Sequence, residues 1–137
     1  MDWKIEVVTV PISDVDRARD FYAEKVDFTV DIDGTVGDGV RFVQLTPPGS
    51  ACSIHLGPGT DGMNPGDLDG VFLVVPDVRA ARADLVGRGV EASEVQVFDD
   101  GVYRPAREGE SLDLVGCVFF GDPDGNRWCV QQIPGGD

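Results

Sequence analysis

The sequence repeats itself, and this repeat limits the folds open to the chain more than any other feature does. Residues 8–19 align with residues 71–82 at a constant offset of 63 positions. Each copy reads as an apolar strand, then an aspartate (Asp14 or Asp77), then an amphipathic helix. An aspartate in this place can accept hydrogen bonds from the first free amides of a helix. The repeat therefore predicts two copies of one strand–helix unit.

A second pair of matching segments completes each copy. Residues 45–54 align with residues 121–130 at an offset of 76 positions. Each segment has a turn with proline and glycine between two runs of β-forming residues, which is typical of a hairpin. With one further short strand after each helix, each half is predicted to be a βαβββ module. The expected strands after the helices lie at about 27–33, 40–45, 51–56, 90–98, 115–120 and 127–133.

These alignments also give the domain organisation. We expect one domain over residues 1–137, with module one at 4–57, a linker rich in Gly, Pro and Asp at 58–69, and module two at 70–133. The two offsets differ by thirteen positions, so module two contains an insertion, which we place at about 99–114. A loop of this length is often a lid or an unordered segment, and the sequence leaves both readings open.

The charge and the cysteines exclude several classes of function. There are 25 acidic residues against 11 basic ones, a formal net charge of −14, which would repel both nucleic acid and an anionic membrane surface. No apolar run approaches the roughly 18 residues of a membrane helix, and the N-terminus has no signal-peptide pattern. We therefore expect a cytoplasmic protein with no nucleic-acid or membrane partner. Its three cysteines, Cys52, Cys117 and Cys129, are expected to be reduced thiols that serve packing.

The paired βαβββ modules, their strand–Asp–helix openings and the run Asp122-Pro123-Asp124-Gly125-Asn126 together resemble the vicinal oxygen chelate superfamily. That superfamily includes glyoxalase I, bleomycin-resistance proteins and extradiol dioxygenases, and the resemblance covers residues 4–133. It implies an α+β fold in which the modules form a curved mixed sheet around a central cavity, with the helices on the convex side. It also implies a small-molecule ligand in that cavity and, as in many members, a homodimer.

Catalytic members of the superfamily hold a divalent metal ion with one side chain from the first strand and one from the last strand of each module. The matching positions in this chain are Val7, Ser53, Gly70 and Cys129. Valine and glycine have no side-chain lone pair, and only Cys129, as a thiolate, would be a good ligand. We therefore expect no metal ion and no other cofactor.

His55 is the one histidine of the chain and lies two residues beyond Ser53, hence on the same face of its strand. An imidazole can act as a general base near neutral pH, so His55 is the one candidate catalytic residue, although a packed or solvent-facing histidine is the simpler reading. Strand alternation places several side chains in the cavity, while the opposite faces, including Trp128, should pack under the helices. The predicted ligand-binding residues, some from the third strand and the insertion, are Val7, Thr9, Arg41, Ser53, His55, Phe72, Tyr103, Arg127, Cys129 and Gln131.

We favour a metal-independent member of the superfamily that binds a small hydrophobic or aromatic molecule in the cavity, as its resistance and sequestration proteins do. One alternative is an enzyme of lyase, isomerase or dioxygenase type, with a metal site of unusual ligands or with metal-free acid–base catalysis by His55. Another is an interaction module with a vestigial cavity. Glyoxalase I activity itself is not expected, because the chain lacks the four metal ligands and a basic site for the carboxylates of glutathione.

Overall fold

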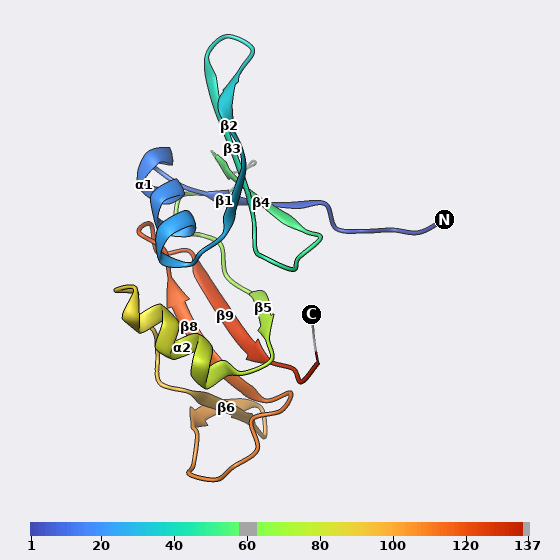
Figure 1. Ribbon diagram of the computed structural model, residues 1–137, viewed down its shortest axis with the longest axis vertical. Coiled ribbons are helices and arrows are strands. Elements are labelled where there is room, and N and C mark those ends of the chain that lie inside the picture. Colours follow the sequence, from blue (N-terminus) through green and yellow to red (C-terminus); the bar gives the residue numbers. More distant parts are fainter. Residues whose placement is uncertain (58–62, 136–137) are drawn as a thin grey trace. The chain divides into compact units, whose positions relative to one another are not determined.

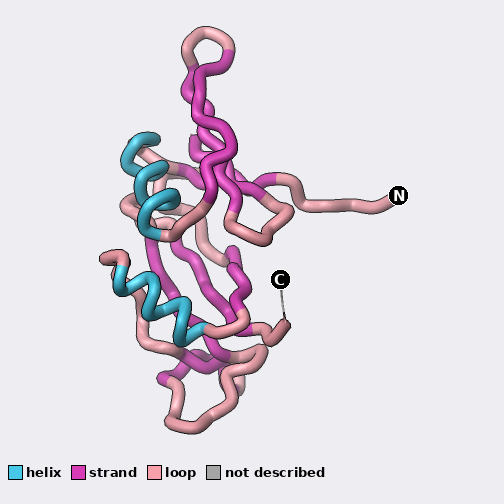
Figure 2. Tube along the Cα trace, viewed as in Figure 1, coloured by secondary structure: helices cyan, strands magenta, loops and turns pink. Residues whose placement is uncertain are grey.

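The computed structural model describes residues 1–57 and 63–135, and the chain forms two compact units. Unit 1 comprises Met1–Leu68 and Asp122–Asn126, and unit 2 comprises Asp69–Gly121 and Arg127–Asp137. Each unit has one mixed β-sheet and one helical segment (Figures 1 and 2). The predicted α+β class is confirmed. In the described residues, no helix is both long and apolar enough to cross a membrane.

Unit 1 has the predicted βαβββ order. Its elements are β1 (Val7–Pro11), α1 (Val15–Asp20), a π-helical turn (Phe21–Lys25), β2 (Thr29–Val36), β3 (Val40–Thr46) and β4 (Ser53–Gly57). The strand order in the sheet is β1-β4-β3-β2, with β1 parallel to β4 and the other neighbours antiparallel. The helix begins where expected, because the carboxylate of Asp14 accepts hydrogen bonds from the amides of Asp16 and Arg17, each at 3.1 Å.

The two faces of this sheet differ in chemistry. One face packs against α1 through buried residues of three strands, namely Val10, Val43, Leu45, Ile54 and Leu56. Side chains alternate along a strand, so the residues between these point to the other side. We call this other side the open face of unit 1, and it carries Thr9, Phe42, Gln44, Ser53 and His55.

Unit 2 has one strand more than predicted. Its elements are β5 (Val71–Val75), α2 (Val78–Gly87), β6 (Gln96–Asp99), β7 (Val102–Pro105), β8 (Gly116–Gly121) and β9 (Arg127–Gln132). The strand order is β5-β9-β8-β6-β7, with only β5 and β9 parallel. The extra strand, β7, lies within the segment expected to be an insertion and forms a hairpin with β6. The strand expected at 90–98 begins only at Gln96, and before it Ala92 makes an isolated bridge to Phe120.

An arginine links the hairpin of β6 and β7 to the rest of the 99–114 segment. The guanidinium of Arg104 donates to Asp99 at 3.0 Å and to Glu110 at 2.9 Å, which ties both ends of the segment to β7. The backbone amide of Arg107 also donates to Glu110, at 2.8 Å. Arg104 and, second, this amide lower the pKa of Glu110 to about 2, so the carboxylate keeps its charge under all ordinary conditions.

The core of unit 2 is built around Trp128, which is 1% exposed and stacks on Phe120 with ring centroids 6.4 Å apart. Val78 and Leu85 of α2 are buried on the same side of the sheet. The prediction that Trp128 belongs to the core is confirmed. The other side, which we call the open face of unit 2, carries Phe72, Phe98, Tyr103, Cys117, Phe119, Arg127 and Cys129.

The turn Asp122–Asn126 joins two strands of unit 2 yet packs as part of unit 1. The hydroxyl of Tyr22 donates to the carboxylate of Asp122 at 2.7 Å, and the amide side chain of Asn126 donates to the carbonyl of Pro11 at 2.7 Å. Both Asp122 and Asn126 are buried. Two residues of the run that suggested the family, Asp122 and Asn126, therefore form a buried polar network with β1 and the π-helical turn of unit 1.

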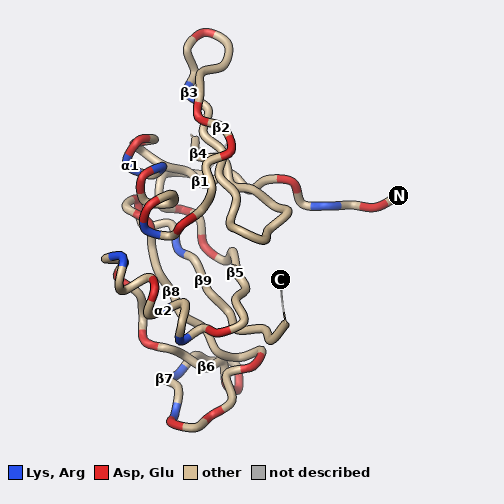
Figure 3. Tube along the Cα trace, viewed as in Figure 1, with Lys and Arg blue, Asp and Glu red and all other residues tan. Residues whose placement is uncertain are grey.

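Acidic residues occur along both units (Figure 3), as the sequence suggested. Several of them on unit 1 are paired with arginines of the same unit, including Asp16, Asp20, Asp33 and Asp124. The negative charge is therefore partly compensated locally.

Candidate functional site

The structure brings four predicted site residues together on the open face of unit 1. In the parallel pairing of β1 and β4, Val7 lies beside Ser53 and Thr9 lies beside His55. Val7 is 41% exposed, whereas Ser53 is buried. The face therefore combines an exposed apolar side chain, Val7, with the polar side chains of Ser53 and His55.

His55 is part of a stacked aromatic pair. Its ring lies 4.7 Å from that of Phe42, at an interplanar angle of 23°. Gly57 makes room for this arrangement, since a Cβ atom there would lie 2.8 Å from Cε1 of His55. Burial lowers the pKa of His55 below its usual 6.5, because the charged imidazolium loses hydration. At neutral pH the pair therefore presents an uncharged aromatic surface.

Ser53 begins a chain of hydroxyl groups. Its Oγ lies 2.7 Å from Oγ1 of Thr46 on the adjacent strand β3. Oγ1 of Thr46 in turn donates to the carboxylate of Asp31 on β2. Neither Thr46 nor Asp31 was among the predicted site residues.

Arg41 lies apart from these residues. Its guanidinium pairs with Asp33 at 2.9 Å and with Asp16, just inside α1, at 3.0 Å. These carboxylates raise the pKa of Arg41, with the hydrogen bond to Asp33 as the largest cause. The arginine is thus turned toward the helix side of the sheet, and the structure does not bring it to His55.

The open face of unit 2 is aromatic. The Tyr103 ring meets those of Phe98 and Phe119 edge-on, each with centroids 5.0 Å apart. The guanidinium carbon of Arg127 lies 4.5 Å from the centroid of Phe119, in a cation–π contact. Phe72 lies beside Cys129 and is 48% exposed. Four aromatic rings and one arginine thus form a partly exposed surface on a rigid sheet.

Gln131, also predicted for the site, has another partner. Its side-chain amide donates to the carbonyl of Leu114 at 2.7 Å. This bond fastens the end of the 99–114 segment to β9 and uses one of the two N–H donors of the Gln131 side chain.

Sequence reasoning missed several residues of the two open faces. Strand alternation around Val118 and Phe120 could have found Cys117 and Phe119, because these lie on the same strand at the intervening positions. Phe98 required the register of β7, which was expected to be a loop. Asp31 lies at an irregularity in the pairing between Val30 and Ile32, so simple alternation does not predict its direction.

The positions that hold a metal ion in catalytic relatives do not fit one here. Val7 and Gly70 have no donor atom, and the hydroxyl of Ser53 is hydrogen-bonded to Thr46. Burial raises the pKa of Cys129 to about 12, with a smaller contribution from Cys117, so its sulfur is a protonated thiol at neutral pH. In the described residues, no three or more His, Cys, Asp or Glu side chains are grouped to hold a metal ion.

This thiol state has a measurable consequence. A thiolate is the reactive form of cysteine, and at pH 8 a pKa of about 12 leaves about a thousandth of the thiolate found in a free cysteine. We expect N-ethylmaleimide to modify the half-buried Cys52 in the native protein while Cys129 reacts about a thousandfold more slowly than free cysteine. Peptide mass spectrometry over time measures both rates, and protein unfolded in urea is the control. Equal labelling of Cys52 and Cys129 in the native protein would contradict the assignment.

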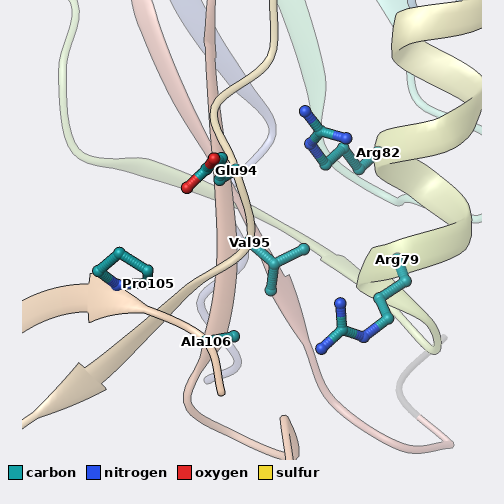
Figure 4. Close-up of a pocket in the computed structure, with 6 residues that line it drawn as sticks. All are labelled: Arg79, Arg82, Glu94, Val95, Pro105 and Ala106. Carbon is teal, nitrogen blue, oxygen red and sulfur yellow. The ribbon is translucent and has the colours of Figure 1, made fainter. Parts of the chain in front are cut away.

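Unit 2 also has an open hollow of about 450 Å³ beside α2 (Figure 4). Arg82 is fixed there by a 2.7 Å hydrogen bond from its Nε to the carbonyl of Ser93. No predicted site residue lines the hollow. Its lining consists of Arg79, Arg82, Glu94, Val95, Pro105 and Ala106.

Comparison with known proteins agrees with this fold. The sequence profile of the Glyoxalase/Bleomycin resistance protein/Dioxygenase superfamily matches residues 4–130. The chain therefore belongs to this superfamily, as its repeat and turn motif predicted. A comparison with curated protein sequences found no match.

Solved structures from bacteria have the same fold. TnmS3, an antibiotic binding protein from Streptomyces sp. CB03234, is 31% identical with a TM-score of 0.75, over 96% of this chain and 97% of that one. A glyoxalase/bleomycin resistance protein from the same strain is 32% identical with a TM-score of 0.72, over 94% of this chain and 100% of that one. A superfamily member from Sphaerobacter thermophilus DSM 20745 is 27% identical with a TM-score of 0.73, over 96% and 98%.

Proposed function

We propose that this protein binds small aromatic molecules on the open face of each unit, taken by itself, without the divalent metal ion of catalytic relatives. The observation that carries the proposal is the surface formed by Phe72, Phe98, Tyr103, Phe119 and Arg127. Aromatic rings held on a sheet lose little conformational entropy on binding and stack well with flat ligands. Two of the four side chains at the metal positions, those of Val7 and Gly70, have no donor atom, which supports a binding role over a catalytic one.

A solved relative supports the same class of ligand. TnmS3, which is 31% identical to this chain, is described as an antibiotic binding protein. Pairing as a homodimer, a cytoplasmic location and a cavity between the modules remain predictions from the sequence. The alternative, acid–base catalysis by His55, would be supported if a bound compound were converted and if His55→Ala abolished that conversion.

Titration of ¹⁵N-labelled protein with 2-naphthol tests the proposal. We expect saturable shifts of amide signals on the open faces, including those of Phe72 and Phe119. Phe119→Ala should weaken binding about tenfold, because it removes an aromatic contact and the ring on which Arg127 rests.

Trp3→Ala is the matched control, since Trp3 is an aromatic residue that is 88% exposed and lies outside both sheets. This variant should bind 2-naphthol as the unaltered protein does. Shifts that do not saturate, or that are confined to the hollow beside α2, would overturn the proposal.

A further inference from the structure

The hydroxyl chain on the open face of unit 1 has a fixed direction. An ionised carboxylate only accepts hydrogen bonds, so in the contact between Asp31 and Thr46 the proton comes from the threonine. A hydroxyl group has one proton, and Thr46 donates this proton in its hydrogen bond to Asp31. Oγ1 of Thr46 must then act as the acceptor in its 2.7 Å contact with Oγ of Ser53.

This direction decides what Ser53 can offer a ligand. Its single hydroxyl proton points to Thr46. The lone pairs of Oγ are then the only hydrogen-bonding groups that the side chain can offer a ligand. In the part of the chain that the structure describes, no group donates a hydrogen bond to this oxygen. Among the described residues, the Oγ atom of Ser53 is therefore a hydrogen-bond acceptor that receives no hydrogen bond.

The surroundings of Ser53 favour an aromatic ligand. His55 lies two residues further along β4 on the same face, about 7 Å away along the strand, and stacks on Phe42. Val7 lies beside Ser53 on the neighbouring strand. A flat ring over the Phe42–His55 pair would thus reach Ser53 with a substituent on its edge.

From these contacts we infer that Ser53 is a specificity residue that selects aromatic ligands carrying a hydrogen-bond donor, such as a phenolic hydroxyl or an amine. The inference rests on the proposed function and adds the polarity of the ligand to it. Ser53 is only 7% exposed, so a ligand lacking a donor would leave the remaining lone pair of its oxygen unpaired. Sites of this kind discriminate against analogues that cannot complete the hydrogen bond.

Two matched probes test the inference. 2-Naphthol has a hydroxyl donor, whereas 2-methoxynaphthalene can only accept, and both have the same ring system. We expect the unaltered protein to bind 2-naphthol about five- to tenfold more tightly, as measured by amide shifts of Phe42, Ser53 and His55. Ser53→Ala, a small change at a buried position, should reduce this preference to less than about twofold.

Thr46→Val tests whether the direction of the hydrogen bond between Ser53 and Thr46, and not only the polarity of Ser53, sets the ligand preference. Valine has nearly the shape of threonine but cannot accept from Ser53, so the serine proton becomes free to turn toward a ligand. Binding of 2-methoxynaphthalene should then improve, and the preference should fall or reverse. Thr35→Val is the control, because Thr35 lies on β2 near the tip of the hairpin and should keep the preference of the unaltered protein.

The outcomes distinguish the two proposals. If neither probe saturates any open-face signals, the proposed function fails and the inference fails with it. If both probes bind with equal affinity, or bind without moving the signals of Phe42, Ser53 and His55, only the inference is overturned. A preference for 2-naphthol that survives in Ser53→Ala would also overturn it.

Discussion

Asn126→Asp should lower the free energy of unfolding by about 3–5 kcal/mol, because it breaks a buried polar network while hardly changing the shape of the side chain. Asn126 is fully buried. Its Nδ2 donates to the carbonyl of Pro11 at 2.7 Å and to the carboxylate of Asp122 at 2.8 Å, and its Oδ1 accepts from the amide of Leu68 at 3.0 Å. An ionised aspartate has no donor, so the carbonyl of Pro11 would lose its 2.7 Å bond and keep only the longer one from the amide of Gly66 at 3.4 Å, and two carboxylates would be set against each other.

Urea unfolding followed by circular dichroism measures this loss. Asn64→Asp is the matched control, because it introduces the same charge at an exposed asparagine whose side chain is not part of the network. We expect the control to change the free energy of unfolding by less than about 1 kcal/mol. Equal effects of the two substitutions would show that charge alone, and not the buried network, is responsible.

Gly66→Ala should destabilise the protein by about 2–4 kcal/mol. The backbone of Gly66 has a φ of +91°, which disfavours any residue with a Cβ atom. A Cβ atom there would also lie 2.4 Å from the carbonyl oxygen of Asp124. The neighbour is backbone, in a turn held by the Asp122 carboxylate, so it cannot move aside cheaply.

Gly87→Ala provides the comparison for thermal and urea unfolding. Gly87 ends α2, and a Cβ atom there would meet nothing within 4 Å. Alanine is the better helix former, so this variant should be neutral or gain up to about 1 kcal/mol. A Gly66→Ala protein as stable as Gly87→Ala would mean that the close approach to Asp124 does not persist in solution.

The sequence correctly predicted the helices, helix caps and strands that depend on local residue patterns. The Asp14 and Asp77 caps, both helices and the strands that carry Ser53 and Trp128 follow from spacing and alternation, and all are present. The strand β7 was missed although its turn can be read from the sequence, because Asp100-Gly101 lies between two β-forming runs and both residues have the positive φ of a two-residue hairpin turn. The bonds of Arg104 to Asp99 and Glu110 add contacts that no periodicity reveals.

The candidate site was predicted in part. Alternation found Val7, Thr9, Ser53 and His55 on one face. It did not find the partners that give these residues their chemistry. Phe42 stacks on His55 and Thr46 takes the proton of Ser53, and both contacts depend on the register between β3 and β4 rather than on either strand alone.

The turn Asp122–Asn126 limits where the chain can be truncated. It is separated from β1 by more than 100 residues of sequence, yet it satisfies the hydroxyl of Tyr22 and the carbonyl of Pro11. A fragment that ended at Leu68 would keep every strand of unit 1 and still lose the side chains of Asp122 and Asn126, which bond to Tyr22 and Pro11. Although the sequence looks like two modules in series, the first is completed only when the ribosome has nearly finished the second.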